Sequence, residues 1–164
     1  MRRPALALAA ALAAAACGSP PRGESDWEKR NLQGPPAEEE VAPPAYPQPA
    51  NLLEFRLPDP EGFRFFVDRT TLSVDKDGVV RYVLVARSSE GAQSVTYEGL
   101  RCQTAENRVF AVGQPDGTWV SARSAWRAIG APRHFALYRD YFCAQSQPIH
   151  NAADGVRALE RGGR

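Results

Sequence analysis

The sequence lacks the features that define several large classes of protein. It has one long apolar run, at the N-terminus, which excludes a membrane protein with several spans. Its three cysteines among 164 residues are too few for a scaffold held together by many disulfides. The 20 basic and 19 acidic residues nearly cancel, and the net charge of +1 gives no reason to expect binding to nucleic acid. The length fits one domain with a modest core.

Catalytic patterns are equally scarce. No serine lies in a Gly-x-Ser-x-Gly pattern, no glycine-rich phosphate loop follows a predicted strand, and no His-Glu-x-x-His pattern occurs. His134 and Asp140 are six residues apart, so they are not neighbours on one helix face. We therefore predict a protein that is not an enzyme and needs no cofactor. A hydrolase of the cell envelope is the catalytic alternative.

The N-terminus has the pattern of an export signal. Two arginines precede an apolar run from Ala5 to Ala16, which is too short to span a bilayer but suits a secretory signal. The run ends in Ala14-Ala15-Ala16-Cys17, which resembles a bacterial lipobox, although that motif normally has leucine where Ala14 stands. We predict a signal peptide over 1–16 and acylation of Cys17, which would anchor the chain in a membrane. In bacterial lipoproteins an aspartate directly after the acylated cysteine often signals retention in the inner membrane. This chain has Gly18 at that position, so we expect the protein on the periplasmic side of the outer membrane. An ordinary cleaved signal and a soluble periplasmic protein are the alternative.

Residues 17–50 are predicted to form a proline-rich, acidic tether. Eight of the fourteen prolines fall here, and six acidic residues outnumber three basic ones. Such a segment cannot bury enough apolar surface to fold alone, and proline favours extended polyproline II structure. Trp27 and Tyr46 are unusual in a polar tether. We expect them to fasten it to the folded part, the alternative being exposed aromatic side chains.

Residues 51–164 show short apolar segments separated by turn residues, which indicates a meander of antiparallel strands. Asp77-Gly78, Glu90-Gly91 and Asp116-Gly117 supply the hairpin turns. Residues 79–87 are apolar at the centre of both faces, so we place this strand in the sheet interior, covered on its second face by a helix or the tether. The predicted strands are 52–57, 64–67, 70–74, 79–87, 94–102, 108–112 and 119–120.

After Trp126 the period of the apolar residues lengthens to that of a helix, which predicts helices. Over 134–142, Phe135, Tyr138 and Phe142 fall on one helical face, and a second helix over 151–161 has Asn151 as its N-cap. The predicted class is α+β, a curved antiparallel sheet with one or two C-terminal helices packed on it. A pure β-barrel is the alternative.

If Cys17 carries lipid, Cys102 and Cys143 are left as a pair. In an oxidising compartment they are expected to form a disulfide that joins the C-terminal helix to the sheet. The alternative is a zinc site that adds His134 and His150 to the two thiolates. The spacing has no likeness to a Cys-x-x-Cys pattern, so we predict no metal.

Four side chains could bind a small ligand. Trp119 and Trp126 could stack on a sugar, with Tyr138 beside them, and Arg101 could bind an anion. The tryptophans are otherwise core residues, and Arg101 is otherwise a solvated charge at a strand end. Our prediction is a non-enzymatic, lipid-anchored domain that acts through envelope proteins or glycans, with a small-ligand or glycan-binding module as the alternative.

The body resembles the CNP1-like family of bacterial envelope proteins. The similarity runs in order through Arg64-Phe65-Phe66-Val67-Asp68, Asp77-Gly78-Val79-Val80-Arg81-Tyr82, Tyr97-Glu98-Gly99-Leu100-Arg101-Cys102, Asp116-Gly117-Thr118-Trp119 and Asp140-Tyr141-Phe142-Cys143. It extends from about Trp27 to Gly163. The resemblance implies a single exported domain in Gram-negative bacteria, often made as a lipoprotein, and no particular enzymatic activity. Both body cysteines fall inside the matching segments, which supports pairing them.

Overall fold

The computed structural model describes residues 42–57 and 62–163. The predicted signal peptide, Cys17, Trp27 and most of the predicted tether lie outside these residues. The longest helix among the described residues, α3 (Ala152–Arg161), has ten residues. No helix in this part of the chain is long and apolar enough to cross a membrane.

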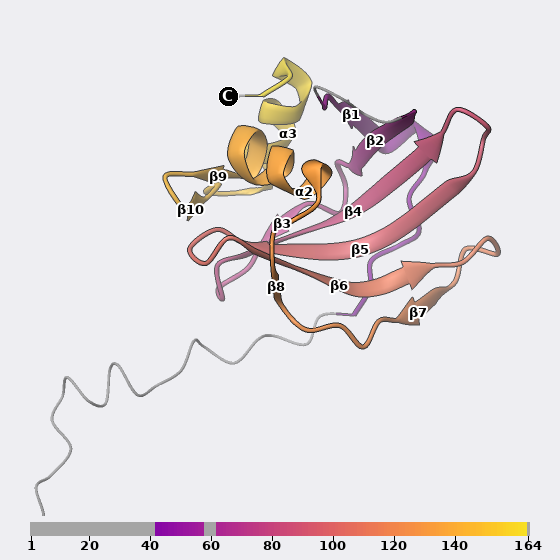
Figure 1. Cartoon of the computed structure of the whole chain (residues 1–164), viewed down its shortest axis with the longest axis horizontal. Helices are drawn as coiled ribbons and strands as arrows, with labels where there is room; N and C mark the ends of the chain where they lie inside the picture. The colour runs from indigo at the N-terminus through magenta and orange to yellow at the C-terminus, as the bar shows by residue number, and fades with distance from the viewer. Residues whose placement is uncertain (1–41, 58–61, 164) are drawn as a thin grey trace, which may run out of the picture. The chain divides into compact units, whose positions relative to one another are not determined.

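An eight-stranded antiparallel sheet forms the body of the protein (Figure 1). Its strands follow the order β1–β2–β4–β5–β6–β7, with β3 paired to β4 and β8 paired to β6. The sheet is an open meander, as predicted, and is not closed into the alternative barrel. The strands are β1 (Leu52–Phe55), β2 (Phe63–Asp68), β3 (Ser73–Val74), β4 (Val79–Ser88), β5 (Gln93–Arg101), β6 (Glu106–Gly113), β7 (Trp119–Ser121) and β8 (Arg127–Ala128).

The predicted hairpin turns are present. Gly78, Gly91 and Gly117 have φ angles of 73°, 90° and 83°, in the left-handed region that glycine enters without strain. Each lies between strands that pair, so the turn residues recognised in the sequence set the order of the meander.

The C-terminal segment adds two helices over one end of the sheet (Figure 1). Helix α2 (Pro132–Ala136) continues into a π-helical turn, η2 (Leu137–Phe142), and a small hairpin of β9 (Cys143–Ala144) and β10 (Gln147–Pro148) leads to α3. The Asn151 side chain accepts a hydrogen bond from the Asp154 amide at 3.0 Å, and Gly162 ends α3 in a left-handed conformation. The predicted α+β class and the N-cap are confirmed.

The π-helical turn overturns one prediction. Phe142 is fully buried, but Phe135 is 49% exposed, so these two residues do not share a core-facing side. A π turn bonds each residue to the fifth along the chain, which shifts the buried face relative to an α-helix. The side chains that face the core here are His134, Leu137, Tyr141 and Phe142.

Strand β4 is buried on both faces, as predicted, because the sheet has a core on each side. Tyr82 and Leu84 belong to the core beneath the C-terminal helices. Val83 and Val85 belong to a smaller core on the opposite face. We call these the helix face and the outer face of the sheet.

Residues 42–48 lie on the outer face and complete its core; we call them the strap. The indole Nε1 of Trp119 donates to the Pro44 carbonyl at 2.8 Å, and the Tyr46 ring lies 5.5 Å from the Trp119 ring. A Cβ atom at Gly113 would lie 2.8 Å from Tyr46 Cε2, so the strap needs glycine there. The predicted fastening through Tyr46 is confirmed, and the packed region includes residues that the sequence analysis assigned to the tether. The short 3₁₀ turn η1 (Pro49–Asn51) joins the strap to β1.

A buried arginine stabilises the turn between β3 and β4. The guanidinium of Arg81, on the outer face, donates to Asp75 Oδ2 and to Asp77 Oδ2, each at 2.6 Å. It also lies 5.5 Å from the centre of the Phe110 ring. The Arg81 side chain is 1% exposed, so its charge depends on the two aspartates for compensation.

Candidate ligand-binding groove

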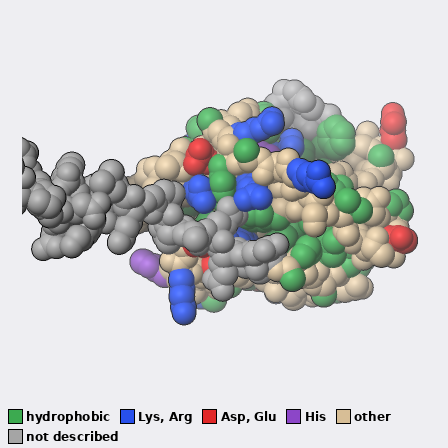
Figure 2. All heavy atoms as spheres, turned by 90° about the horizontal axis from the view of Figure 1, so that it is seen from below, with side chains coloured by type: hydrophobic (Ala, Val, Ile, Leu, Met, Phe, Trp, Pro, Cys, Tyr) green, Lys and Arg blue, Asp and Glu red, His purple; other side chains and the backbone are tan. Residues whose placement is uncertain are grey.

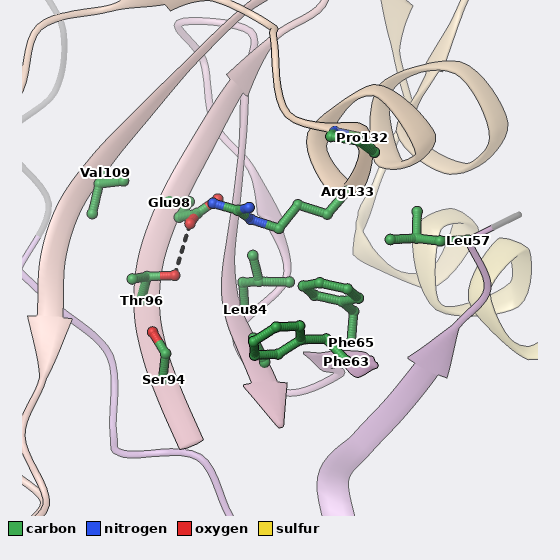
Figure 3. Close-up of a pocket in the computed structure, with 11 residues that line it drawn as sticks. Leu57, Phe63, Phe65, Leu84, Ser94, Thr96, Glu98, Val109, Pro132 and Arg133 are labelled. Carbon is green, nitrogen blue, oxygen red and sulfur yellow. Dashed lines mark hydrogen bonds between the residues drawn. The ribbon is translucent and has the colours of Figure 1, made fainter. Parts of the chain in front are cut away.

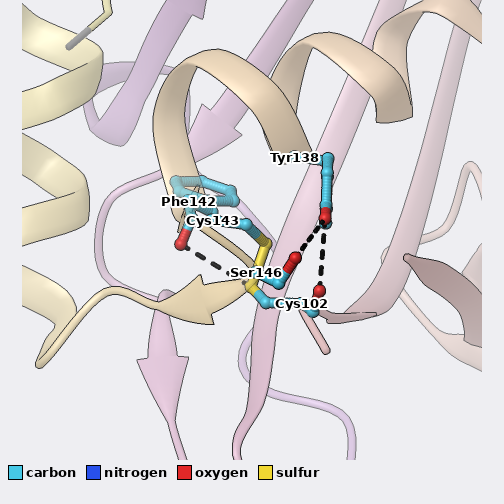
Figure 4. The surroundings of a disulfide bond; sticks show 5 residues. All are labelled: Cys102, Tyr138, Phe142, Cys143 and Ser146. Carbon is cyan, nitrogen blue, oxygen red and sulfur yellow. Dashed lines mark hydrogen bonds between the residues drawn. A yellow bond between two sulfur atoms is a disulfide. The ribbon is translucent and has the colours of Figure 1, made fainter. Parts of the chain in front are cut away.

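Cys102 and Cys143 form a disulfide, as predicted (Figure 4). Their Cα atoms are 5.4 Å apart, and the bond joins the end of β5 to the segment that follows η2. Tyr138 contributes to the same junction, because its hydroxyl donates to the Cys102 carbonyl at 3.3 Å. The disulfide removes both thiolates on which the zinc alternative depended. Among the described residues no cluster of three metal-ligating side chains occurs.

The four residues predicted to bind a ligand are spread over both faces of the sheet. Arg101 lies 4.0 Å from the centre of the Trp126 ring, while Trp119 packs between Tyr46 and Tyr97 on the outer face. Tyr138 belongs to the disulfide junction on the other side of the sheet. On the face seen in Figure 2, basic side chains lie among hydrophobic ones, in keeping with such stacking. Of these four residues, the structure brings Arg101 and Trp126 into contact, and a ligand-binding role for the four stays a prediction.

A groove of about 350 Å³ opens on the helix face, next to the start of α2 (Figure 3). Its floor is formed by apolar side chains of the sheet, and Pro132 and Arg133 form the wall beside α2. Clefts of about 300–1,000 Å³ hold small ligands in many proteins. The floor includes Phe65 and Leu84, and the opposite wall includes Leu57 and Phe63.

A buried carboxylate lies at the helix end of the groove. Glu98 Oε1 accepts a hydrogen bond from Thr96 at 2.7 Å, and Oε2 accepts one from Tyr82 at 3.3 Å. His134 Nε2 is 2.8 Å from the same Oε2. The ring N–H of His134 is not aligned with that oxygen, so the two groups are in close contact without a well-directed hydrogen bond.

The surroundings of Glu98 favour its charged form. Burial acts to raise the pKa of Glu98, but His134 and the Thr96 hydroxyl outweigh it, so its pKa lies below the ordinary value of 4.5. Burial and the negative charge of Glu98 raise the pKa of Tyr82 well above 10, so the phenol stays protonated and donates its hydrogen. The carboxylate is therefore partnered on both oxygens within the protein.

Among the described residues that line the groove, no nucleophile is aligned with a base. His134 contacts Glu98, and within residues 42–57 and 62–163 neither His134 nor His150 hydrogen-bonds to a serine or aspartate. A hydrolase mechanism would need such a partner. What the groove offers is an apolar surface with charged side chains at one end, which suits binding.

The sequence analysis did not select Glu98 or Arg133. A signal for Glu98 was present, because the strand pattern puts it on the same face as Thr96 and Leu100, where a carboxylate is unexpected in a core. No sequence pattern indicated a site role for Arg133, because its position over the groove depends on how α2 crosses the sheet.

Comparison with known proteins gives one match. No curated protein and no solved structure matches the chain. The model of the CNP1-like family matches residues 31–160, which include the sheet, the groove and both disulfide cysteines. The predicted resemblance is thus confirmed, and the chain belongs to the CNP1-like family.

Proposed function

We propose that this chain is an exported, lipid-anchored and non-enzymatic domain that acts by binding on the periplasmic side of the outer membrane. The observation that carries the proposal is the disulfide between two buried cysteines, Cys102 and Cys143. Structural disulfides of this kind persist in oxidising compartments such as the periplasm. The basic and apolar N-terminal sequence ending in Cys17 supplies the matching export and acylation signal.

The strap supports a tethered arrangement. It holds the chain against the outer face from Pro44 onward, so a tether attached at Cys17 would join the body on the side away from the groove. The proline-rich sequence between them favours an extended spacer.

A small-ligand-binding module is the second candidate function. The groove on the helix face favours it, because it is concave, has an apolar floor and has charged groups at one end. This candidate replaces the four aromatic and basic residues predicted from the sequence with a different set, centred on Phe65, Leu84 and Arg133.

The export proposal is tested by the mass of the mature N-terminus. The wild-type chain, produced with its own leader in a Gram-negative host, should begin at an acylated Cys17 and fractionate with outer membranes. The Cys17→Ser variant should lose both properties. An unmodified or full-length wild-type N-terminus would contradict the anchor.

The disulfide gives a second readout. In the exported chain, thiol labelling under denaturing conditions should find Cys102 and Cys143 blocked until a reductant is added. Free thiols at both positions in periplasmic material would contradict export to an oxidising compartment as the reason for the pairing.

A further inference from the structure

Among the described residues, the helix face of the sheet is only partly covered. The C-terminal helices cover the end that holds Tyr82 and Leu100, and the groove lies next to the start of α2 (Figure 3). From Leu84 and Thr96 in the groove, the strand register continues to Val112 on β6 and Val120 on β7. Directly paired residues of an antiparallel sheet point to the same face. The groove thus continues into an apolar strip across the sheet.

The helix face exposes several large apolar side chains. Phe63, Val112 and Val120 are 42%, 38% and 54% exposed, and they account for three of the four exposed large hydrophobic residues in the described part of the chain. Their side chains all belong to the helix face, as the strand register requires. Exposed apolar side chains are ordinary when scattered, but three on one face of the sheet, beside a groove, favour a binding surface.

The cation beside the strip is Arg133. Both oxygens of Glu98 are partnered by Thr96, Tyr82 and His134, as described above. Arg133 reaches over the groove toward Glu98 in Figure 3, and its charge helps to lower the pKa of Glu98, but its guanidinium makes no hydrogen bond or ion pair with any residue in 42–57 or 62–163. An arginine in this state offers a planar set of donors that matches a carboxylate or phosphate.

We propose that the groove binds a single-chain amphiphile, with its anionic head on Arg133 and its alkyl chain along Phe65, Leu84 and Val109. This inference rests on the second candidate function, the ligand-binding module, and names its ligand class. A sugar would find few partners on the floor, because the Thr96 hydroxyl is already used by Glu98. Apolar surface next to a guanidinium that no described residue hydrogen-bonds is the complement of an amphiphilic anion.

The test is calorimetric titration of the full chain carrying Cys17→Ser, which removes the need for detergent. The probes are hexanoate, octanoate, decanoate and decyl phosphate below their micelle concentrations, with decanol as the uncharged control. Affinity should rise about two- to fourfold for each added methylene until the groove is full. Decanoate and decyl phosphate should both bind more tightly than decanol.

Two variants locate the ligand. Arg133→Ala should weaken decanoate about tenfold and leave decanol unchanged, whereas Arg127→Ala, which removes an exposed arginine on β8, should change neither. Ser94→Trp places a large ring in the groove from an exposed position and should abolish binding of every probe. Gln93→Trp, next to it but on the opposite face of β5, should not.

Three results would overturn the inference. Absence of saturable binding by all the charged probes would exclude an amphiphilic anion. Equal affinity for decanol and decanoate, unaffected by Arg133→Ala, would exclude the anionic head while leaving the groove as a ligand site. Equal loss in the Gln93→Trp and Ser94→Trp variants would show that binding is not in the groove. None of these results bears on the N-terminal mass, which tests the anchor separately.

Discussion

Removal of the Cys102–Cys143 disulfide tests how the two halves of the domain are held together. We consider the double variant Cys102→Ala/Cys143→Ala. The bond fixes the end of β5 to the segment after η2, and the chain between the cysteines includes β6, β7, β8 and α2. Without the bond the folded contacts of these elements remain, but the unfolded chain gains freedom.

The magnitude follows from the length of the closed loop. The cysteines are 41 residues apart, and the chain-entropy relation then gives about 4 kcal/mol at 25 °C. The two side chains are 1% and 4% exposed, so alanine also leaves a small buried space at each site. We therefore expect the free energy of unfolding to fall by about 4 kcal/mol, a large part of the stability of a domain of this size.

The measurement is equilibrium unfolding in urea, followed by tryptophan fluorescence, for the double variant and for the wild type with and without a reductant. Reduced wild type and the variant should have similar midpoints, both well below that of oxidised wild type. The reductant should not change the variant. A difference of less than 1 kcal/mol between the oxidised wild type and the variant would refute the account of the disulfide as the main constraint on this loop.

Three further predictions follow from buried contacts. Arg81→Met should lower the free energy of unfolding by about 3 kcal/mol, because two aspartates lose their buried partner; urea midpoints check this. Tyr46→Ala should release the strap, shift Trp119 emission to longer wavelength and cost about 1–2 kcal/mol; an unchanged spectrum would contradict the packing. The pKa of Glu98 is lowered in the folded protein, so its stabilising effect is complete above pH 4.5 and is lost as the pH falls through its folded value. Glu98→Gln should therefore weaken the loss of stability between pH 7 and pH 3 relative to wild type.

The sheet could be predicted because short stretches of sequence specify its turns and its strands. Asp77-Gly78 and Asp116-Gly117 each specify a tight turn, and the runs beside them alternate or stay apolar over strand lengths. Asn151 and Gly162 specify the ends of α3 in the same way. These signals involve residues a few positions apart, so the backbone they favour does not depend on the rest of the fold.

Other features depend on contacts between residues far apart in the sequence, so no short sequence pattern predicts them. The register shift between β5 and β6 puts both Phe110 and Ala111 on the outer face, where Phe110 packs on Tyr97. The π turn after α2 changes which side chains face the core, and hence the partner of Glu98. The groove depends on both features. Its residues could not be selected from the sequence, although the strands that contribute them could.

The exposed apolar side chains of the helix face are consistent with a difference in length between elements. Strand β4 has ten residues and is about 33 Å long, whereas α3, also of ten residues, is about 15 Å long. A helix of this length laid along the strands would cover only about half of the length of β4. The disulfide fixes the C-terminal segment to one end, so the helices cannot shift toward the other. On the outer face the strap covers the corresponding region. Within the described residues, the exposure of Phe63, Val112 and Val120 therefore follows from the native packing, and the proposed amphiphile would cover the groove beside them.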